Sequence, residues 1–175
     1  MNKRGQFYLI SAIVIIGLII VFAGVSNYLE KDEETKLYDL KQDLEIESEN
    51  VLAYGTYYAF DEEQMLNLLQ GFIEAYSEYG EVQKIIFIFG NRQKITVLGY
   101  QQLEDEVVKI QGGEEELELE LSGGADPSSG KLEQPGETVV VIVGDSAYEF
   151  DLREGENFYF IIAQEIEGEQ YVVTG

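Results

Sequence analysis

The pattern of hydrophobic and polar positions begins with a long apolar segment. Residues 7–25 carry no charged side chain, and a helix of that length spans roughly 28 Å at about 1.5 Å per residue. Backbone groups inside a bilayer must be paired within a lone span, so the segment is predicted to be a transmembrane helix. The residues expected to anchor it are its large apolar side chains, Phe7, Leu9, Ile13, Ile15, Ile16, Ile19, Ile20 and Phe22.

The pattern beyond this segment remains helical. Apolar positions follow a heptad-like spacing at Leu37, Leu40, Leu44, Val51, Tyr54 and Tyr58, with Glu47 as the one exception. One unbroken helix from Gln6 to about Ala53 would be roughly 70 Å long, half transmembrane and half amphipathic. Gly55 is the expected stop.

A second, shorter helix is predicted after this stop. Asp61 and Gln64 have the spacing of a capping box. The stripe that follows, at i, i+4, i+7 and i+11, comprises Met65, Leu69, Phe72 and Tyr76. Gly80 is expected to end this helix.

From residue 81 onward the pattern favours β-strands. Residues 85–89 and 95–98 predict a hairpin with its turn at Gly90-Asn91, and Leu117, Leu119 and Leu121 alternate with glutamates. Residues 122–136 contain both prolines and predict a loop. Further strands are expected at 139–143, 148–152, 158–164 and 170–174, and the tight turns between them favour an antiparallel meander.

The predicted fold class is therefore α+β: a long N-terminal helix with transmembrane and amphipathic halves, a second shorter helix, and an antiparallel β-sheet domain. The expected organisation is a basic leader at 1–5, a transmembrane helix at 6–28, a helical stalk and second helix packed on the head at 29–80, and a β-rich extracellular domain at 81–175. Aromatic side chains in predicted elements are expected to pack in the core or between subunits, among them Tyr57, Tyr58, Phe72, Phe87, Phe89, Phe158 and Phe160.

The distribution of charge sets the orientation. Lys3 and Arg4 precede the apolar segment, whereas all 34 acidic residues lie at or beyond Glu30. Because positive charge is retained on the cytoplasmic side, the prediction is a single-pass cell membrane protein with a cytoplasmic N-terminus and an extracellular C-terminal domain. The formal net charge of −23 argues against nucleic acid as a partner.

The residue types present give little support to catalysis. The chain has no Cys and no His, so thiol nucleophiles and the commonest general base and metal ligand are missing. The carboxylate triplets 104–106 and 114–116 lack the ligand spacing of a calcium loop and are expected to be a solvated face. No catalytic residue, metal site or cofactor is predicted, although a carboxylate-based hydrolase is retained as a minor alternative.

The leader also allows two other interpretations. The apolar segment could be a buried core helix, although its length exceeds what a globular helix needs. Alternatively, Val21 and Ala23 have the small-residue spacing of a secretory signal that is cut after Ala23.

One feature of the leader resembles a known family. The sequence Lys3-Arg4-Gly5-Gln6, directly before the apolar segment, resembles the class III signal of archaeal type IV pilin-like proteins. The resemblance covers about the first fifty residues and the order of a long helix before a β-rich head. It implies cleavage by a prepilin peptidase between Gly5 and Gln6. At the fifth position after that cut many pilins carry a Glu that helps subunit registration, whereas this chain has Ile10.

The resemblance implies a membrane-anchored subunit that assembles into an extracellular filament through its N-terminal helix. Its expected partners are copies of itself, membrane lipid, prepilin peptidase and the pilus assembly machinery. The alternative hypothesis is an uncleaved, single-pass, membrane-tethered extracellular binding domain.

Overall fold

The computed structural model describes residues 36–80, 82–124, 126–166 and 169–175. The chain divides into two units, Met1–Lys36 and Leu37–Gly175, and the second contains nearly all of the described residues. A first helix covers residues 36–57, and α2 (Glu62–Gly80) follows it. The strands are β1 (Lys84–Asn91), β2 (Lys94–Gln101), β3 (Glu106–Gly112), β4 (Glu115–Leu121), β5 (Ser128–Glu133), β6 (Thr138–Val143), β7 (Ser146–Asp151), β8 (Asn157–Ile166) and β9 (Glu169–Thr174).

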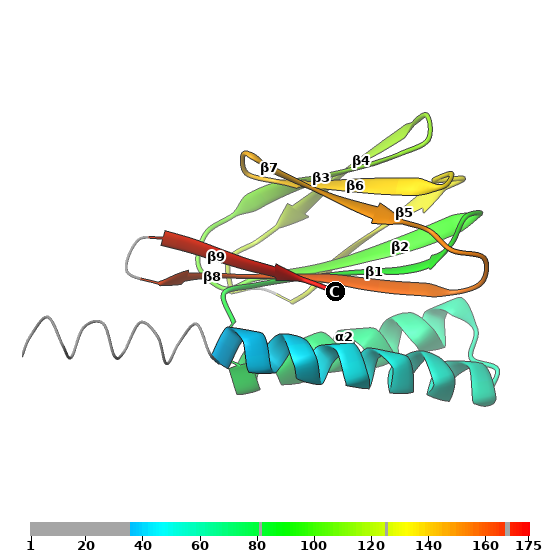
Figure 1. The fold of residues 1–175 in the computed structure, drawn as a ribbon, viewed down its shortest axis with the longest axis horizontal. Coiled ribbons are helices and arrows are strands. Elements are labelled where there is room, and N and C mark those ends of the chain that lie inside the picture. Colours follow the sequence, from blue (N-terminus) through cyan, green and yellow to red (C-terminus); the bar gives the residue numbers. More distant parts are fainter. Residues whose placement is uncertain (1–35, 81, 125, 167–168) are drawn as a thin grey trace, which may run out of the picture. The chain divides into compact units, whose positions relative to one another are not determined.

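The strands form two antiparallel sheets. One has five strands in the order β5-β2-β1-β8-β9, and the other has four in the order β4-β3-β6-β7 (Figure 1). The chain changes sheet between β2 and β3, between β4 and β5, between β5 and β6, and between β7 and β8. The result is a β-sandwich in which each sheet combines strands distant in sequence.

The two faces of the five-stranded sheet belong to two different cores. One face carries Ile86 and Ile88 and packs against side chains of the four-stranded sheet, including Val108 and Val141. The opposite face carries Phe87 and packs against side chains of both helices, which lie along this face in Figure 1. Consecutive residues of β1 are therefore all buried, which explains the uninterrupted apolar run at 85–89.

The predicted fold class is wrong. The β-rich part consists of two sheets rather than one meander. The tight-turn pattern predicted that the strands near 148–152 and 158–164 are neighbours, but the connection between β7 and β8 crosses from one sheet to the other. The described helices are amphipathic, and among the residues that the structure describes no helix is both long and apolar enough to cross a membrane. The transmembrane half predicted at 6–28 lies outside the described residues.

The prediction of a loop at 122–136 is also wrong, because this segment contains β5. This strand pairs with β2, for example at Leu132 with Ile95. Leu132 is its one large apolar residue, so the period-2 signal of a strand is nearly absent from its sequence. Gly130 allows a close approach here, since a Cβ atom at that position would lie 2.6 Å from Leu117 Cδ2.

Several local predictions are confirmed. The helix α2 ends at Gly80, β1 and β2 form the hairpin, and β4 buries Leu119 and Leu121 while its glutamates stay exposed. The predicted strands near 139–143, 148–152, 158–164 and 170–174 correspond to β6, β7, β8 and β9. The hairpin turn lies two residues later than predicted, because Asn91 still pairs with Lys94 in the ladder.

Candidate functional site

The residues predicted to carry function lie outside the described residues. These are the orientation residues Lys3 and Arg4, the processing site at Gly5 and Gln6, and the anchor residues Phe7, Leu9, Ile13, Ile15, Ile16, Ile19, Ile20 and Phe22. The structure therefore brings none of them together, and they stay predictions. A second candidate lies within the described residues, at the connection between the two helices.

This connection is a tight helical hairpin. Gly55 was predicted to stop the first helix, but the helix continues to residue 57 and buries Gly55 against α2. A Cβ atom at Gly55 would lie 2.1 Å from Met65 Cε, so the missing side chain lets the helices approach closely. Asp61 and Gln64 then form the predicted capping box, with N–O distances of 2.9 and 3.1 Å.

The end of the first helix has the hydrogen bonds of a Schellman motif. The N–H of Ala59 donates to Thr56 O at 3.1 Å, and the N–H of Phe60 donates to Gly55 O at 2.9 Å. Ala59 occupies the left-handed position of this motif with φ of +53°, where glycine is the usual residue. The backbone is therefore strained at the point that places Phe60.

Four aromatic rings gather at this strained turn, and we call them the aromatic cluster: Tyr54, Tyr57, Tyr58 and Phe60. Ring centroids lie 4.6 Å apart for Tyr54 and Tyr58, and 5.0 Å apart for Tyr57 and Tyr58. Phe60 meets Tyr54 edge-on at 5.6 Å. The three tyrosines are 49%, 82% and 57% exposed in chain order. Tyr57 and Tyr58 therefore do not pack in the core, and packing between subunits, the other expectation for them, stays a prediction.

A cavity of about 520 Å³ adjoins the aromatic cluster, with Phe60 and Met65 in its wall. Its carboxylates include those of Asp61 and Glu156, and its cation is Lys94. Glu156 accepts a hydrogen bond from Asn91 Nδ2 at 2.9 Å, and Asp61 accepts one from the N–H of Gln64. Neither carboxylate has an ion-pair partner among the described residues.

Lys94 is engaged by other carboxylates. Its ammonium lies 2.9 Å from Glu62 Oε2 and 3.3 Å from Glu133 Oε1, and these contacts raise the pKa of Lys94. Glu62 also pairs with Lys131 of β5, and the hydrogen bonds from Lys131 and Lys94 lower the pKa of the Glu62 carboxyl. This network attaches the start of α2 to the β2–β5 edge of the five-stranded sheet.

A second cavity, of about 410 Å³, surrounds Lys84 and is lined by Gln83, Gln101 and Gln164 among others. The side chain of Lys84 is 8% exposed, and its ammonium pairs with Glu106 of β3. Because Lys84 belongs to β1, this ion pair joins the two sheets. Its charge is already balanced, so the cavity lacks an uncompensated cation that would attract an anion.

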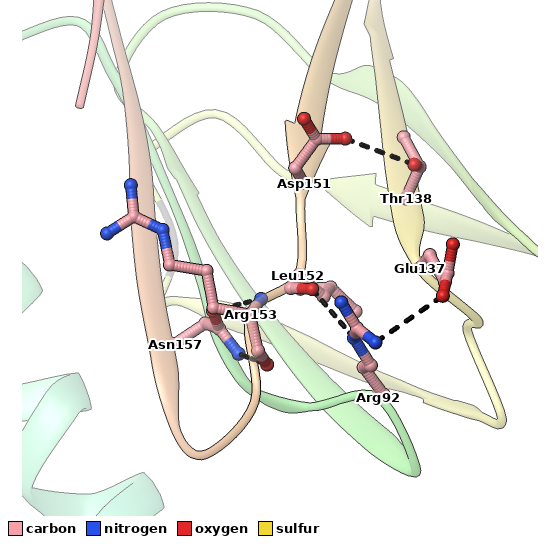
Figure 2. A network of polar contacts seen from close by, with 7 residues as sticks. All are labelled: Arg92, Glu137, Thr138, Asp151, Leu152, Arg153 and Asn157. Carbon is pink, nitrogen blue, oxygen red and sulfur yellow. Dashed lines mark hydrogen bonds and ion pairs between the residues drawn. The ribbon is translucent and has the colours of Figure 1, made fainter.

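At the other end of β1, hydrogen bonds and one ion pair surround the β7–β8 connection (Figure 2). The ion pair joins Arg92 Nη1 and Glu137 Oε1 at 3.4 Å. Asn157 is 6% exposed; its Oδ1 accepts from the N–H of Arg153 at 2.8 Å, and its Nδ2 lies 2.9–3.2 Å from three carbonyl oxygens. Arg92 Nε donates to Leu152 O at 2.8 Å. These contacts tie the β7–β8 connection to β1 and to the β1–β2 turn, which is a structural role.

The acidic triplets do not form a metal centre. Glu106 pairs with Lys84, Asp105 accepts from the N–H of Gly123, and Glu115 accepts from the N–H of Glu133. Within the described ranges, no group of three or more potential ligands is arranged to hold a metal ion. The carboxylates of these triplets thus serve local structure or face solvent.

Comparisons with known proteins add no relative: no family model, no curated protein and no solved structure matches this chain.

Proposed function

We propose that the chain is a membrane-anchored, pilin-like subunit that associates with copies of itself through its N-terminal apolar segment into an extracellular filament. The observation that carries the proposal is the uncharged run at residues 7–25, placed directly behind Lys3-Arg4-Gly5-Gln6. On this proposal a prepilin peptidase cuts between Gly5 and Gln6, and the pilus assembly machinery then transfers the segment from lipid to contacts with identical segments.

The charge distribution supports association through this segment rather than through the sandwich. All 34 acidic residues lie at or beyond Glu30, and like charges on neighbouring copies repel. Contacts between the apolar segments of neighbouring copies, in contrast, involve no charged side chain and so carry no such repulsion. The acidic unit then faces the medium outside the cell. Lys3 and Arg4 favour this orientation, because positive charge before the apolar segment is retained on the cytoplasmic side.

The test replaces one residue in the middle of the segment. Ile15→Asp introduces a charge that costs about 2.5–3.5 kcal/mol or more at the centre of a bilayer, so membrane retention and filament yield are both expected to fall severely. Ile15→Leu, the matched control, keeps the volume and should leave both unchanged. Sheared surface fractions and membranes are compared by quantitative immunoblotting. A filament yield from Ile15→Asp equal to that of the control would contradict the proposal.

The second candidate is an uncleaved, membrane-tethered binding domain, and the exposed aromatic cluster favours it. In that case residues 1–5 remain on the mature chain, and the detergent-solubilised protein is monomeric. No surface fraction would contain it, and Ile15→Asp would affect membrane retention alone.

A further inference from the structure

We propose that the aromatic cluster, together with the carboxylates of Asp61 and Glu156, binds a basic segment of a partner protein and stacks an arginine side chain on the tyrosine rings. This inference goes beyond the proposed function and does not depend on leader processing or on filament assembly.

The aromatic cluster is exposed to solvent. Tyr57 is 82% exposed and Tyr58 is 57% exposed, although each offers a large area whose burial is favourable. Their hydroxyl groups form no hydrogen bond with any described residue that would explain the outward position. Tyrosine is enriched at the energetic centres of protein interfaces, because one end is apolar and the other can be hydrogen-bonded.

The turn that presents the rings is strained. Ala59 is held with φ of +53°, a conformation that costs an L-residue roughly 1–2 kcal/mol. That conformation reverses the chain so that Phe60 packs edge-on against Tyr54, and Tyr54 in turn supports Tyr58. Rings that already contact one another lose little conformational freedom when a ligand binds.

The charges beside the rings complement a basic ligand. Asp61, Glu156 and Phe60 line the same cavity, and neither carboxylate has a cation partner within the described part of the chain. Lys94, the cation of the same cavity, is shared by Glu62 and Glu133. Phe60 is the member of the aromatic cluster that lines this cavity, and the tyrosine rings continue the cluster outside the cavity wall. A basic segment can therefore set one cation against the carboxylates and stack an arginine on the tyrosine rings, because a guanidinium group stacks on aromatic faces.

The same charges argue against a second copy of this chain as the occupant. The formal net charge is −23, so two copies brought together at this face would place uncompensated carboxylates near one another. A basic partner segment removes that repulsion.

The experiment measures binding to the full chain in detergent micelles by isothermal titration calorimetry. The probe is a short peptide of alternating glycine and arginine with both ends blocked. Its control replaces each arginine with citrulline, which keeps the planar shape and removes the charge. The arginine peptide is expected to bind, and binding is expected to weaken about tenfold or more with citrulline.

The variants separate the aromatic cluster from the general acidity. The double substitution Tyr57→Ala, Tyr58→Ala should weaken binding of the arginine peptide about tenfold. Tyr38→Ala removes a tyrosine that is 58% exposed on the same helix but outside the cluster, and it should change nothing. Tyr57→Phe keeps the ring and should bind like the unchanged chain.

A second pair of variants tests the carboxylate without touching the rings. Glu156→Gln should weaken binding several-fold, and Glu154→Gln, the matched control two residues away, should not. Equal weakening by both, or unchanged affinity in the double tyrosine variant, would mean that the peptide responds only to net charge and would overturn the proposal. Self-association of the unchanged chain in sedimentation, lost in the double tyrosine variant, would assign the surface to a second copy and overturn it as well.

Discussion

The substitution Asn157→Asp tests how the β7–β8 connection is held. It exchanges one NH₂ group for an oxygen and barely changes the volume. The amide Nδ2 of Asn157 lies 3.2 Å from Gly90 O, 3.1 Å from Arg153 O and 2.9 Å from Gly155 O. After the substitution an ionised oxygen would face these three carbonyl oxygens. The hydrogen bonds that the other oxygen accepts, from the N–H of Arg153 at 2.8 Å and from the hydroxyl of Tyr159 at 3.5 Å, would remain.

The expected magnitude has two parts. The NH₂ group donates two hydrogen bonds, each contributing about 1 kcal/mol. Leaving a buried charge without a partner raises the total to about 3–5 kcal/mol, and the side chain of Asn157 is only 6% exposed. Since 1 kcal/mol shifts the Tm of a chain of this length by about 2–4 °C, we expect Tm to fall by about 10 °C at pH 8.

The deficit should depend on pH. Burial and the facing carbonyl oxygens raise the pKa of the introduced carboxyl above its value in the unfolded chain. The folded state therefore binds the proton more tightly, so the deficit is full above the raised pKa and shrinks as pH falls through it toward the pKa of the unfolded chain. Between pH 8 and pH 5 the Tm difference from the unchanged chain should become smaller.

The assay is thermal unfolding of the full chain in detergent, followed by circular dichroism. Asn67→Asp is the matched control, because it makes the same exchange of NH₂ for oxygen at an exposed position of α2. It should lower Tm by no more than about 3 °C, as a surface substitution does. Equal Tm values for the two variants at pH 8 would refute the reasoning.

Three further substitutions test other parts of the fold by the same assay. Ala59→Gly should stabilise the chain by about 0.5–1 kcal/mol, because glycine adopts the left-handed backbone without strain. Ala53→Gly, in the first helix, should destabilise the chain by about 1 kcal/mol. A change of the same sign in the free energy of unfolding of both variants would contradict the strain at Ala59. Glu106→Ala should cost about 3 kcal/mol because it leaves the Lys84 ammonium unpaired, and adding Lys84→Met should recover most of the loss; simple additivity would contradict this. Glu62→Gln should lower Tm slightly at pH 7. The Tm difference from the unchanged chain should vanish as pH falls through the lowered pKa of Glu62, because the ion pairs stabilise the fold only while this carboxyl is ionised. A Tm difference that stays the same at low pH would contradict the ion pairs.

Local signals predicted individual elements well. The capping box at Asp61 and Gln64 is confirmed by its two hydrogen bonds, and the glutamate–leucine alternation of β4 is confirmed by the burial of Leu119 and Leu121. The capping box and the alternation each depend on a few consecutive residues, and the helical or extended backbone fixes how those residues are placed. The pairing of strands across the two sheets is not such a property, because it depends on contacts between distant residues such as Leu132 and Ile95.

The aromatic cluster was missed because the heptad pattern was extended too far. The buried positions of the first helix are Leu37, Leu40, Leu44, Ser48 and Gly55. The step of 18 residues from Leu37 to Gly55 equals five turns at the helical period of 3.6. A strict seven-residue repeat drifts by about 20° per heptad relative to a straight helix. By the third heptad the drift had placed Tyr54 and Tyr58 on the buried side, whereas both are exposed. The density of aromatic residues at 54–60 was the available signal.

Processing of the leader is the step on which assembly into a filament depends. The measurement that tests this central claim most directly is the intact mass and N-terminal sequence of the chain, from native membranes and from sheared surface filaments. Pilin-type processing predicts a chain in the filaments that begins at Gln6. A chain that begins at Met1 and occurs only in membranes would contradict it in favour of the tethered binding domain, and one that begins at Gly24 in the medium would mean that the segment is a secretory signal.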